Sequence, residues 1–379
     1  MTAQRWAWAE IDLGALRHNV ATLATHIGPQ QLWAVVKANA YGHGAIECAR
    51  VALQSGAQGL CVALVQEGIA LRRAGINAPI LIMSEQPAGQ YRDIISYGLI
   101  ATLYNEATIT EFARTANDLE IMATVHMKVD SGMHRVGVSP EDAVKVANLV
   151  AESPWLSLEG MFTHLATADV ADMQFAQQQI STFSQSVDRV RASGIDVRHV
   201  HVSNSASAIR RLDDGVGCTM ERVGIAMYGI PGDAHSNSFG AAHQLDLRPV
   251  MSIHARVSHV QRVAAGQGVS YGLKRPIESD STVATLPLGY ADGVPRGLWE
   301  SGSVLIGGIR RPFAGVVTMD QIMVNCTDDA VRIGDEVVLI GAQGSEVITT
   351  NEWANKMGTI GYEILTSLGA RYNRVYMSS

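Results

Sequence analysis

One lysine stands where an enzyme would need a reactive amine. Lys37 follows an apolar run, residues 32–36, whose length and β-branched content predict a buried strand. Burial disfavours an ammonium ion and lowers the pKa of lysine, and the neutral amine can attack a carbonyl and hold it as a Schiff base. Tyr41, Gly42 and Gly44 then offer a hydroxyl donor and open backbone, which suit a phosphate group. A lone lysine after an apolar run more often marks a strand end with its ammonium in solvent, so the choice depends on the surrounding motif.

The segment of residues 125–137 ends a predicted strand in a turn that is rich in cations. Lys128 and Arg135 would repel each other, and would repel Lys37, if all three shared a site of low dielectric constant. Asp130 supplies only one counter-charge. Taken alone, the segment is equally consistent with a solvated loop.

Further polar residues lie at the ends of later predicted strands. His164 follows one of them, where a lone histidine more often has a structural role than a catalytic one. Ser203 and Asn204 precede a predicted helix and are first of all helix caps. The free backbone N–H groups at the start of such a helix also form an anion site, however, and barrels commonly bind phosphate after their seventh and eighth strands. Arg222 begins an apolar strand and needs a hydrogen-bond acceptor there.

A regular alternation of predicted strands and helices positions these residues. Eight strands fall at residues 32–36, 59–63, 79–83, 99–103, 122–129, 158–162, 197–202 and 222–230, with helices between them, one of which is predicted at residues 85–96. This is the pattern of a (β/α)₈ barrel, in which catalytic residues lie at the carboxyl ends of the strands. An open, doubly wound sheet is the alternative, but no Gly-x-Gly-x-x-Gly fingerprint follows the first strand.

The rest of the chain has a different pattern. A short strand is predicted at residues 6–13, and residues 231–244 have the polar, Gly- and Ser-bearing composition of a linker. Strands then follow closely at 250–263, 283–288, 303–307, 313–317, 322–326 and 337–341, with a helix at 352–357 and a strand at 374–377. We therefore predict an α/β chain with an N-terminal barrel domain, residues 1–240, and a C-terminal, mostly β domain, residues 241–379.

Composition restricts the partners and the compartment. The 379 residues are 47% hydrophobic and 17% charged, which is ordinary for a soluble globular protein of two or three domains. A net charge of −7 argues against nucleic acid or an anionic membrane as the main partner. The four cysteines are far apart and lack metal-ligand spacing, so we expect reduced thiols in the cytoplasm and no metal site. No signal peptide or transmembrane stretch is visible.

Taken together, these motifs resemble those of alanine racemases, and the resemblance runs from about residue 6 to residue 371. Residues 34–44 are similar, almost letter for letter, to the segment that carries pyridoxal phosphate in that family. By this resemblance, Arg222 faces the pyridine nitrogen of the cofactor, and His164 hydrogen-bonds the arginine. The implied cofactor ligands are Lys37, Tyr41, His164, Ser205, Arg222, Gly224, Ile225 and Tyr362.

The resemblance also assigns roles to the cations. A guanidinium keeps its proton near neutral pH, so a ring nitrogen that faces Arg222 stays unprotonated. The ring is then a weaker electron sink than it would be with a carboxylate partner, which suits proton return and suppresses transamination. In the family, the lysine that matches Lys128 is often carbamylated, which turns a cation into an anion. That carbamate positions the arginine that matches Arg135, which faces the substrate carboxylate and the ring hydroxyl of the cofactor.

Racemisation needs a base on each face of the substrate, because a single base tends to return the proton to its original face. Lys37 can serve one face. Residues 269–272 resemble the catalytic tyrosine motif of the family, which reaches the active site of the other subunit in a head-to-tail homodimer. Tyr271 would need nearby cations to work as a base, since a free tyrosine has a pKa near 10. By itself, a Tyr-Gly pair is only a turn signal.

Two more segments of the β domain match the family. The resemblance implies that Met319 offers its backbone N–H to the substrate carboxylate across the dimer interface. Tyr290 and Tyr362 would form the inner gate of the substrate channel. Thr318 stands where many relatives have cysteine, so inhibition directed at that thiol would be lost.

The resemblance therefore implies a pyridoxal-phosphate-dependent enzyme that interconverts L- and D-alanine, for peptidoglycan synthesis or for D-alanine degradation. A racemase of serine or of broader specificity is the first alternative, because an apolar wall discriminates one hydroxyl weakly. A related decarboxylase is disfavoured, since Arg135 and Met319 would hold the carboxylate. A non-catalytic pyridoxal-phosphate carrier is the third alternative, but such single-barrel relatives lack the β domain that contains Tyr271.

Overall fold

The computed structural model describes residues 5–212, 217–232 and 245–378. These residues form two compact units. Over the described residues, the barrel unit comprises Ala15–Ala40 and Gly44–Arg248, and the β unit comprises Met1–Gly14, Tyr41–His43 and Pro249–Ser379. The predicted domain boundary at residue 240 lies outside the described residues, as do residues 233–244 of the predicted linker.

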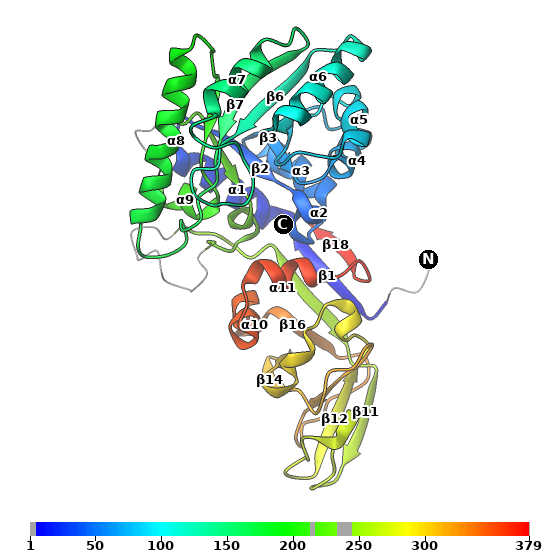
Figure 1. Ribbon diagram of the computed structural model, residues 1–379. Coiled ribbons are helices and arrows are strands. Elements are labelled where there is room, and N and C mark those ends of the chain that lie inside the picture. Colours follow the sequence, from blue (N-terminus) through cyan, green and yellow to red (C-terminus); the bar gives the residue numbers. More distant parts are fainter. Residues whose placement is uncertain (1–4, 213–216, 233–244, 379) are drawn as a thin grey trace. The chain divides into compact units, whose positions relative to one another are not determined.

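Eight parallel strands form the core of the barrel unit (Figure 1). They are β2 (Gln31–Val35), β3 (Ala57–Val62), β4 (Ile80–Ile82), β5 (Ala101–Leu103), β6 (Ala123–Lys128), β7 (Leu156–Phe162), β8 (His199–His201) and β9 (Met220–Val223). The eight strands are divided between two sheets, which have the orders β4-β3-β2-β9 and β5-β6-β7-β8. Ile82 N donates to Ile100 O at 3.0 Å, and Thr219 N donates to Val200 O at 2.9 Å, so both pairs of sheet edges are joined. The strands close into a barrel, which confirms the predicted fold class.

Helices flank these strands, as the alternating pattern predicts. They are α1 (Leu13–Ile27), α3 (Ala45–Gln54), α4 (Val65–Arg73), α5 (Tyr91–Ser96), α6 (Glu106–Leu119), α7 (Ala143–Ala151), α8 (Gln174–Ala192) and α9 (Ser205–Arg210). In α6, Asn105 caps the first turn by accepting from Ala107 N at 3.0 Å, and Ile109, Phe112 and Ala116 are buried at helical spacing. Of the helices that the structure describes, none has both the length and the apolar composition needed to cross a bilayer.

Two barrel elements differ from their predictions. The helix predicted at residues 85–96 is only α5 preceded by a 3₁₀ turn, Ala88–Gln90, because Pro87 lacks an N–H and interrupts the run. The eighth strand ends at Val223 instead of residue 230. After Val223, the chain turns at Gly224 into a 3₁₀ segment, Ile225–Tyr228. Ser205 of α9 holds this turn, because its Oγ accepts from Gly224 N.

The β unit contains two sheets (Figure 1). The larger sheet has the order β14-β13-β16-β10-β1-β18, with β17 paired to β16, and the smaller has the order β11-β12-β15. The N-terminal strand β1 pairs with β10 and β18, so it joins segments that follow it by more than 200 residues. The strands are β1 (Ala7–Asp12), β10 (Met251–Arg256), β11 (His259–Val263), β12 (Ser281–Leu286), β13 (Ser303–Ile306), β14 (Ile309–Pro312), β15 (Ile322–Asn325), β16 (Glu336–Gln343), β17 (Glu346–Ile348) and β18 (Asn373–Met377); the helices are α10 (Thr350–Met357) and α11 (Gly361–Ser367).

Two predicted strands of the β unit are interrupted. The run at residues 250–263 is divided between β10 and β11, which lie in different sheets. The run at residues 313–317 forms only a bridge between Phe313 and Val324. Gly315 breaks the extended run with a φ of 80°, and it lies so close to Val269 O that a Cβ would be 2.1 Å away.

Candidate active site

Lys37 follows the carboxyl end of β2 in the barrel unit. Val36 is fully buried, and its N–H donates to Cys61 O at 2.9 Å, which ties the chain beside the lysine to β3. Burial lowers the pKa of Lys37, and the positive charge of Arg135 lowers it further. Glu67 and Cys61 act in the opposite direction. The lysine that the sequence singled out is therefore an amine with an increased neutral fraction.

The backbone directly after Lys37 forms a left-handed turn, α2 (Lys37–Tyr41). Ala38, Asn39 and Ala40 have φ values of 51°, 53° and 55°, and Tyr41 has a φ of 51°. Among these residue types, only asparagine adopts this conformation readily. Strain of this kind concentrates at functional sites, where the surrounding structure must enforce it.

Arg222 lies on β9 and is almost fully buried. Its Nη1 lies 2.5 Å from His201 Nδ1, and its Nη2 donates to Thr163 O at 2.9 Å. His164 Nδ1 lies 3.5 Å from the same Nη2, and the guanidinium carbon lies 5.1 Å from the ring centre of Phe162. These contacts hold the guanidinium in one orientation.

A chain of two buried imidazoles extends from Arg222. Arginine can only donate, so His201 Nδ1 must accept, and His201 Nε2–H then donates to His126 Nδ1 at 3.0 Å. Burial lowers the pKa of His126 to about 3 and lowers the pKa of His201 well below its usual value, so both rings are neutral at pH 7. His126 Nε2–H has no partner within the described part of the chain. Neither histidine is among the predicted site residues, because the only sequence signal of each is a polar residue inside an apolar strand.

The cationic turn after β6 also takes a defined shape. Asp130 Oδ1 accepts from Gly132 N and from His134 N, each at 3.0 Å, so this carboxylate shapes the loop. Lys128 is 6% exposed, and burial together with the charges of Arg135 and Arg222 lowers its pKa to about 8. Arg135 itself is exposed. The structure thus brings Lys37, Lys128, Arg135 and Arg222 close enough to influence one another.

The residues after β8 and β9 provide hydrogen-bond donors for an anion. Ser205 Oγ accepts from Gly224 N at 3.0 Å and from Ala226 N at 3.2 Å, and neither bond uses its own O–H as a donor. Ser203 Oγ is buried and unpartnered among the residues that the structure describes. Asn204 caps α9 by accepting from Ser207 N at 3.1 Å, which is the capping role predicted for it. Serine hydroxyls at a helix start fit a phosphate group.

Tyr41 and Tyr362 lie together in the β unit, with ring centres 6.2 Å apart. The backbone next to Tyr41 is fixed there, because Arg374 Nε donates to Gly42 O at 2.7 Å. Gly42 has a φ of 87° and lies against Leu365 O, where a Cβ would be 2.7 Å away. Only glycine fits this contact.

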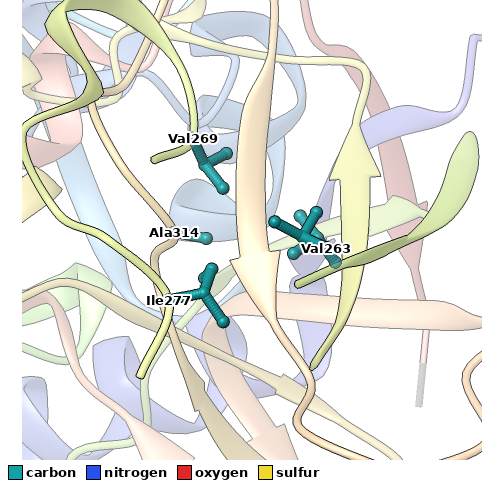
Figure 2. Close-up of a cluster of buried hydrophobic side chains, with 5 residues drawn as sticks. Val263, Val269, Ile277 and Ala314 are labelled. Atoms are coloured by element: carbon teal, nitrogen blue, oxygen red, sulfur yellow. The ribbon is translucent and has the colours of Figure 1, made fainter. Parts of the chain in front are cut away.

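The loop that contains Tyr271 is anchored by a small apolar cluster, which is shown in Figure 2. Its buried members are Val263, Val269, Ile277, Val283 and Ala314. Val269 points into the cluster, and Ser270 has a φ of 67° and donates from Oγ to Val316 O at 2.7 Å. Tyr271 is 74% exposed. The loop is therefore firmly held while its tyrosine extends into solvent.

Tyr290 and Met319 lie on two loops that are hydrogen-bonded to each other. Tyr290 N donates to Thr318 O at 3.0 Å, and Ala291 N donates to Met319 O at 3.1 Å. Buried Asp292 supports the first loop by accepting from Gly289 N at 2.9 Å. Both predicted residues are exposed. The structure thus pairs Tyr41 with Tyr362, and it places Tyr290 beside the loop of Met319.

A pocket of about 430 Å³ opens at the other end of the barrel. Gln31, which begins β2, lines it together with Trp33, His126 and His199. Lys37 follows the opposite end of the same strand. The pocket therefore opens away from Lys37, and His126, which lines it, is linked to Arg222 through His201.

Comparisons with known proteins match both parts of the chain. The family described as "Alanine racemase, N-terminal domain" matches residues 11–231, and "Alanine racemase, C-terminal domain" matches residues 250–376. Alanine racemase from Halothermothrix orenii is 39% identical over 374 residues, which cover 98% of this chain and 97% of the relative. The crystal structure of alanine racemase from Bacillus anthracis with bound L-Ala-P has a TM-score of 0.93 at 35% identity, covering 100% of this chain and 96% of that chain. A histidine racemase from Leuconostoc mesenteroides has a TM-score of 0.90 at 25% identity, covering 100% and 99%.

The relatives that match both the barrel and the β domain are amino-acid racemases, a class of isomerases. The present chain belongs to one family of that class, the alanine racemases. The histidine racemase shows that members of the class act on other amino acids with nearly the same fold.

Proposed function

We propose that this chain racemises alanine with pyridoxal phosphate bound in the barrel unit. The observation that carries the proposal is Lys37, a lysine with a lowered pKa at the carboxyl end of a barrel strand, close to the fixed guanidinium of Arg222. Membership of the alanine racemase family supports alanine as the substrate.

The donors of the barrel unit fit the cofactor. Ser205, Gly224 and Ile225 would hold its phosphate, with Tyr41 and Tyr362 as further ligands. Arg222 would donate to its ring nitrogen and would keep its own proton, with His164 beside it. When bound, pyridoxal phosphate withdraws electrons from the substrate Cα and so acidifies its proton. The hydroxyl of Ser203, which has no partner among the described residues, and the O–H of Ser205 support a phosphate at this end of the barrel.

Two bases would move the proton. Lys37 would hold the cofactor and, once the substrate has replaced it, take or return the Cα proton on one face. Tyr271 of a second copy of the chain would do the same on the other face. The exposed, anchored loop of Tyr271 supports this role, because it offers a rigid tyrosine to a partner in a homodimer.

The substrate carboxylate needs cationic or N–H partners. We assign it to Arg135 and to the backbone N–H of Met319, and this retention of the carboxylate argues against decarboxylation. Carbamylation of Lys128 would supply an anion beside Arg135: the neutral amine adds CO₂ and releases one proton. A pKa of about 8 leaves part of Lys128 neutral at pH 7 and so supports this reaction. Tyr290 and Tyr362 would gate the channel.

Two physiological directions are open to such an enzyme, supply of D-alanine for peptidoglycan and degradation of D-alanine. All four cysteines are free thiols, which supports a reducing, cytoplasmic location.

The test incubates the purified chain and pyridoxal phosphate with L-alanine in D₂O and follows optical rotation and Cα deuterium together. We expect rotation to vanish as deuterium enters, with serine and histidine reacting more slowly than alanine. Deuterium uptake with rotation retained would contradict the second base. Absence of exchange would favour a carrier of pyridoxal phosphate.

A further inference from the structure

Glu67 is hydrogen-bonded to the segments that follow β2 and β3, although it was not among the predicted site residues. Its Oε1 accepts from Ala38 N, the first N–H after Lys37, at 2.6 Å. Its Oε2 accepts from Ala63 N at 2.8 Å and from Leu64 N at 3.1 Å. One carboxylate therefore ties the end of β2 to the end of β3 and to the start of α4.

The contact with Ala38 falls on the first residue of the left-handed turn. Alanine has no intrinsic preference for this conformation, because its Cβ crowds the following carbonyl. Within the turn, Ala40 N donates to Val36 O at 2.9 Å. The side chain of Asn39 reaches the start of α3, where its Oδ1 accepts from Ala45 N at 2.9 Å. Glu67 thus fixes the beginning of the turn, and Asn39 joins it to α3.

Glu67 is also a charge near the lysine. Arg135, from the loop after β6, and Arg222, from β9, disfavour the ammonium form of Lys37. Glu67, from α4, and Cys61, from β3, favour it. Loss of the Glu67 charge should therefore lower the pKa of Lys37, whereas loss of its geometry should disturb the turn.

We propose that Glu67 is a positioning residue for Lys37, whose carboxylate enforces the left-handed turn and so fixes the direction in which the lysine leaves β2. The inference rests on the proposed function in taking Lys37 as the residue that binds pyridoxal phosphate. The alternative is that Glu67 only caps α4, a common role for glutamate at the third position of a helix.

Glu85 provides a matched control, because it does similar work elsewhere in the barrel. Its Oε1 accepts from Tyr104 N at 2.6 Å and from Asn105 N at 2.7 Å, and so it ties the loop after β4 to the start of α6. Glu85→Gln and Glu67→Gln each place an amide where a carboxylate accepts several N–H groups. Both changes should lower the melting temperature of the chain by similar amounts.

Two measurements on Lys37 separate positioning from capping. The first is the affinity for pyridoxal phosphate, followed by its absorbance and by mass spectrometry of the borohydride-reduced Lys37 peptide. The second is the pH midpoint at which Lys37 of the cofactor-free full chain reacts with an amine-selective acylating reagent. We expect Glu67→Gln to weaken pyridoxal phosphate binding by about tenfold or more, as loss of a charged hydrogen bond does, and to move the midpoint to lower pH. Glu85→Gln should change neither reading.

Two further variants separate geometry from charge. Glu67→Asp keeps the charge but shortens the reach, so it should weaken pyridoxal phosphate binding and leave the midpoint near that of the unaltered chain. Ala38→Gly added to Glu67→Gln should restore much of the binding, because glycine adopts the left-handed turn without steric cost, while the midpoint stays low. If Glu67→Gln does not fold, Glu67→Asp with and without Ala38→Gly carries the test.

The proposal is overturned if the Glu67 and Glu85 variants lower the melting temperature alike and leave both Lys37 readings unchanged. It is also overturned if Ala38→Gly rescues none of the binding lost in a Glu67 variant. Failure of the proposed function has a different signature, since the unaltered chain would then not attach pyridoxal phosphate to Lys37 at all.

Discussion

The barrel unit and the β unit prepare their polar residues in opposite ways. In the barrel, Arg222 and Lys128 are nearly buried, and neutral imidazoles and backbone carbonyls hold the arginine. In the β unit, Tyr271 is 74% exposed and Met319 is 53% exposed, on loops whose backbones are firmly held. One unit contains a desolvated centre, and the other presents side chains that contact little of their own unit.

This difference teaches that the two units have different tasks. Desolvation and nearby charges tune the lysines, so the barrel can provide a reactive amine by itself. Tyr271 lies largely in solvent, and it gains a catalytic environment only when another surface covers it. The contrast supports the proposal that a second chain completes each active site. The substitutions below test the tasks of the two units.

Lys37→Ala should have the largest effect. It removes both the residue that would hold pyridoxal phosphate and one of the two bases, so we expect racemase activity to fall by at least about 10⁴-fold. Borohydride reduction followed by peptide mass spectrometry should find no cofactor attached at position 37. Attachment at another lysine with activity retained would refute the role of Lys37.

Tyr271→Phe should distinguish the role of the β unit from the role of the barrel unit. Pyridoxal phosphate should still attach to Lys37, while racemisation falls by about 10²- to 10⁴-fold because one general base is lost. Tyr97→Phe is the control, since Tyr97 lies on the barrel surface and its hydroxyl accepts from Arg73 Nη2, at 3.3 Å. Near-normal turnover of Tyr271→Phe in both directions would exclude the two-base scheme.

His201→Phe tests how the barrel holds its arginine. The substitution removes the acceptor of Arg222 Nη1 and the donor to His126, so we expect a loss of about 2–4 kcal/mol in the free energy of unfolding. His126→Phe breaks only one of these two bonds and should cost about half as much. Chemical denaturation of both variants measures the difference, and equal losses would show that Arg222 does not depend on the imidazole chain.

Lys128→Met should have a smaller, pH-dependent effect. The folded pKa of about 8 lies below the unfolded value of about 10.5, so the unfolded chain binds more protons between these values and stability rises with pH there. In CO₂-free buffer the variant should therefore be the more stable protein at pH 7, by at most about 3 kcal/mol, and the gap should close as the pH rises from about 8 to 10. Added bicarbonate should stabilise only the unaltered chain if Lys128 is carbamylated. If the difference in stability between Lys128→Met and the unaltered chain did not change with pH, this result would contradict the lowered pKa of Lys128.

Periodicity was sufficient to predict the barrel. Each of the eight strands is a short apolar segment between helices, and local patterns of this kind survive in the fold. Periodicity could not show that β1 pairs with β10 and β18, because strand pairing across more than 200 residues has no local signal. It also could not divide the run at residues 250–263 between two sheets.

The candidate site shows the same limit at the level of single residues. Lys37 and Arg222 are visible because charges interrupt apolar strands. The left-handed turn at Ala38 and Ala40 is not visible, because alanine favours the right-handed helix and only tertiary contacts reverse it. Glu67 escaped notice for a related reason: a glutamate in the first turn of a helix is ordinary, and its contact with Ala38 depends on two strands lying side by side.

The central claim, that the barrel of one chain and the tyrosine loop of another form one site, is tested most directly by mixing inactive variants. Lys37→Ala and Tyr271→Phe chains would be dissociated, combined in equal amounts and reassociated, and alanine racemisation would be measured. If sites are shared between chains, half of the dimers are hybrids and each hybrid contains one unaltered site, so activity should return to about a quarter of the normal value. If Lys37 and Tyr271 act within one chain, every site keeps one defect, and the mixture should stay as inactive as its components.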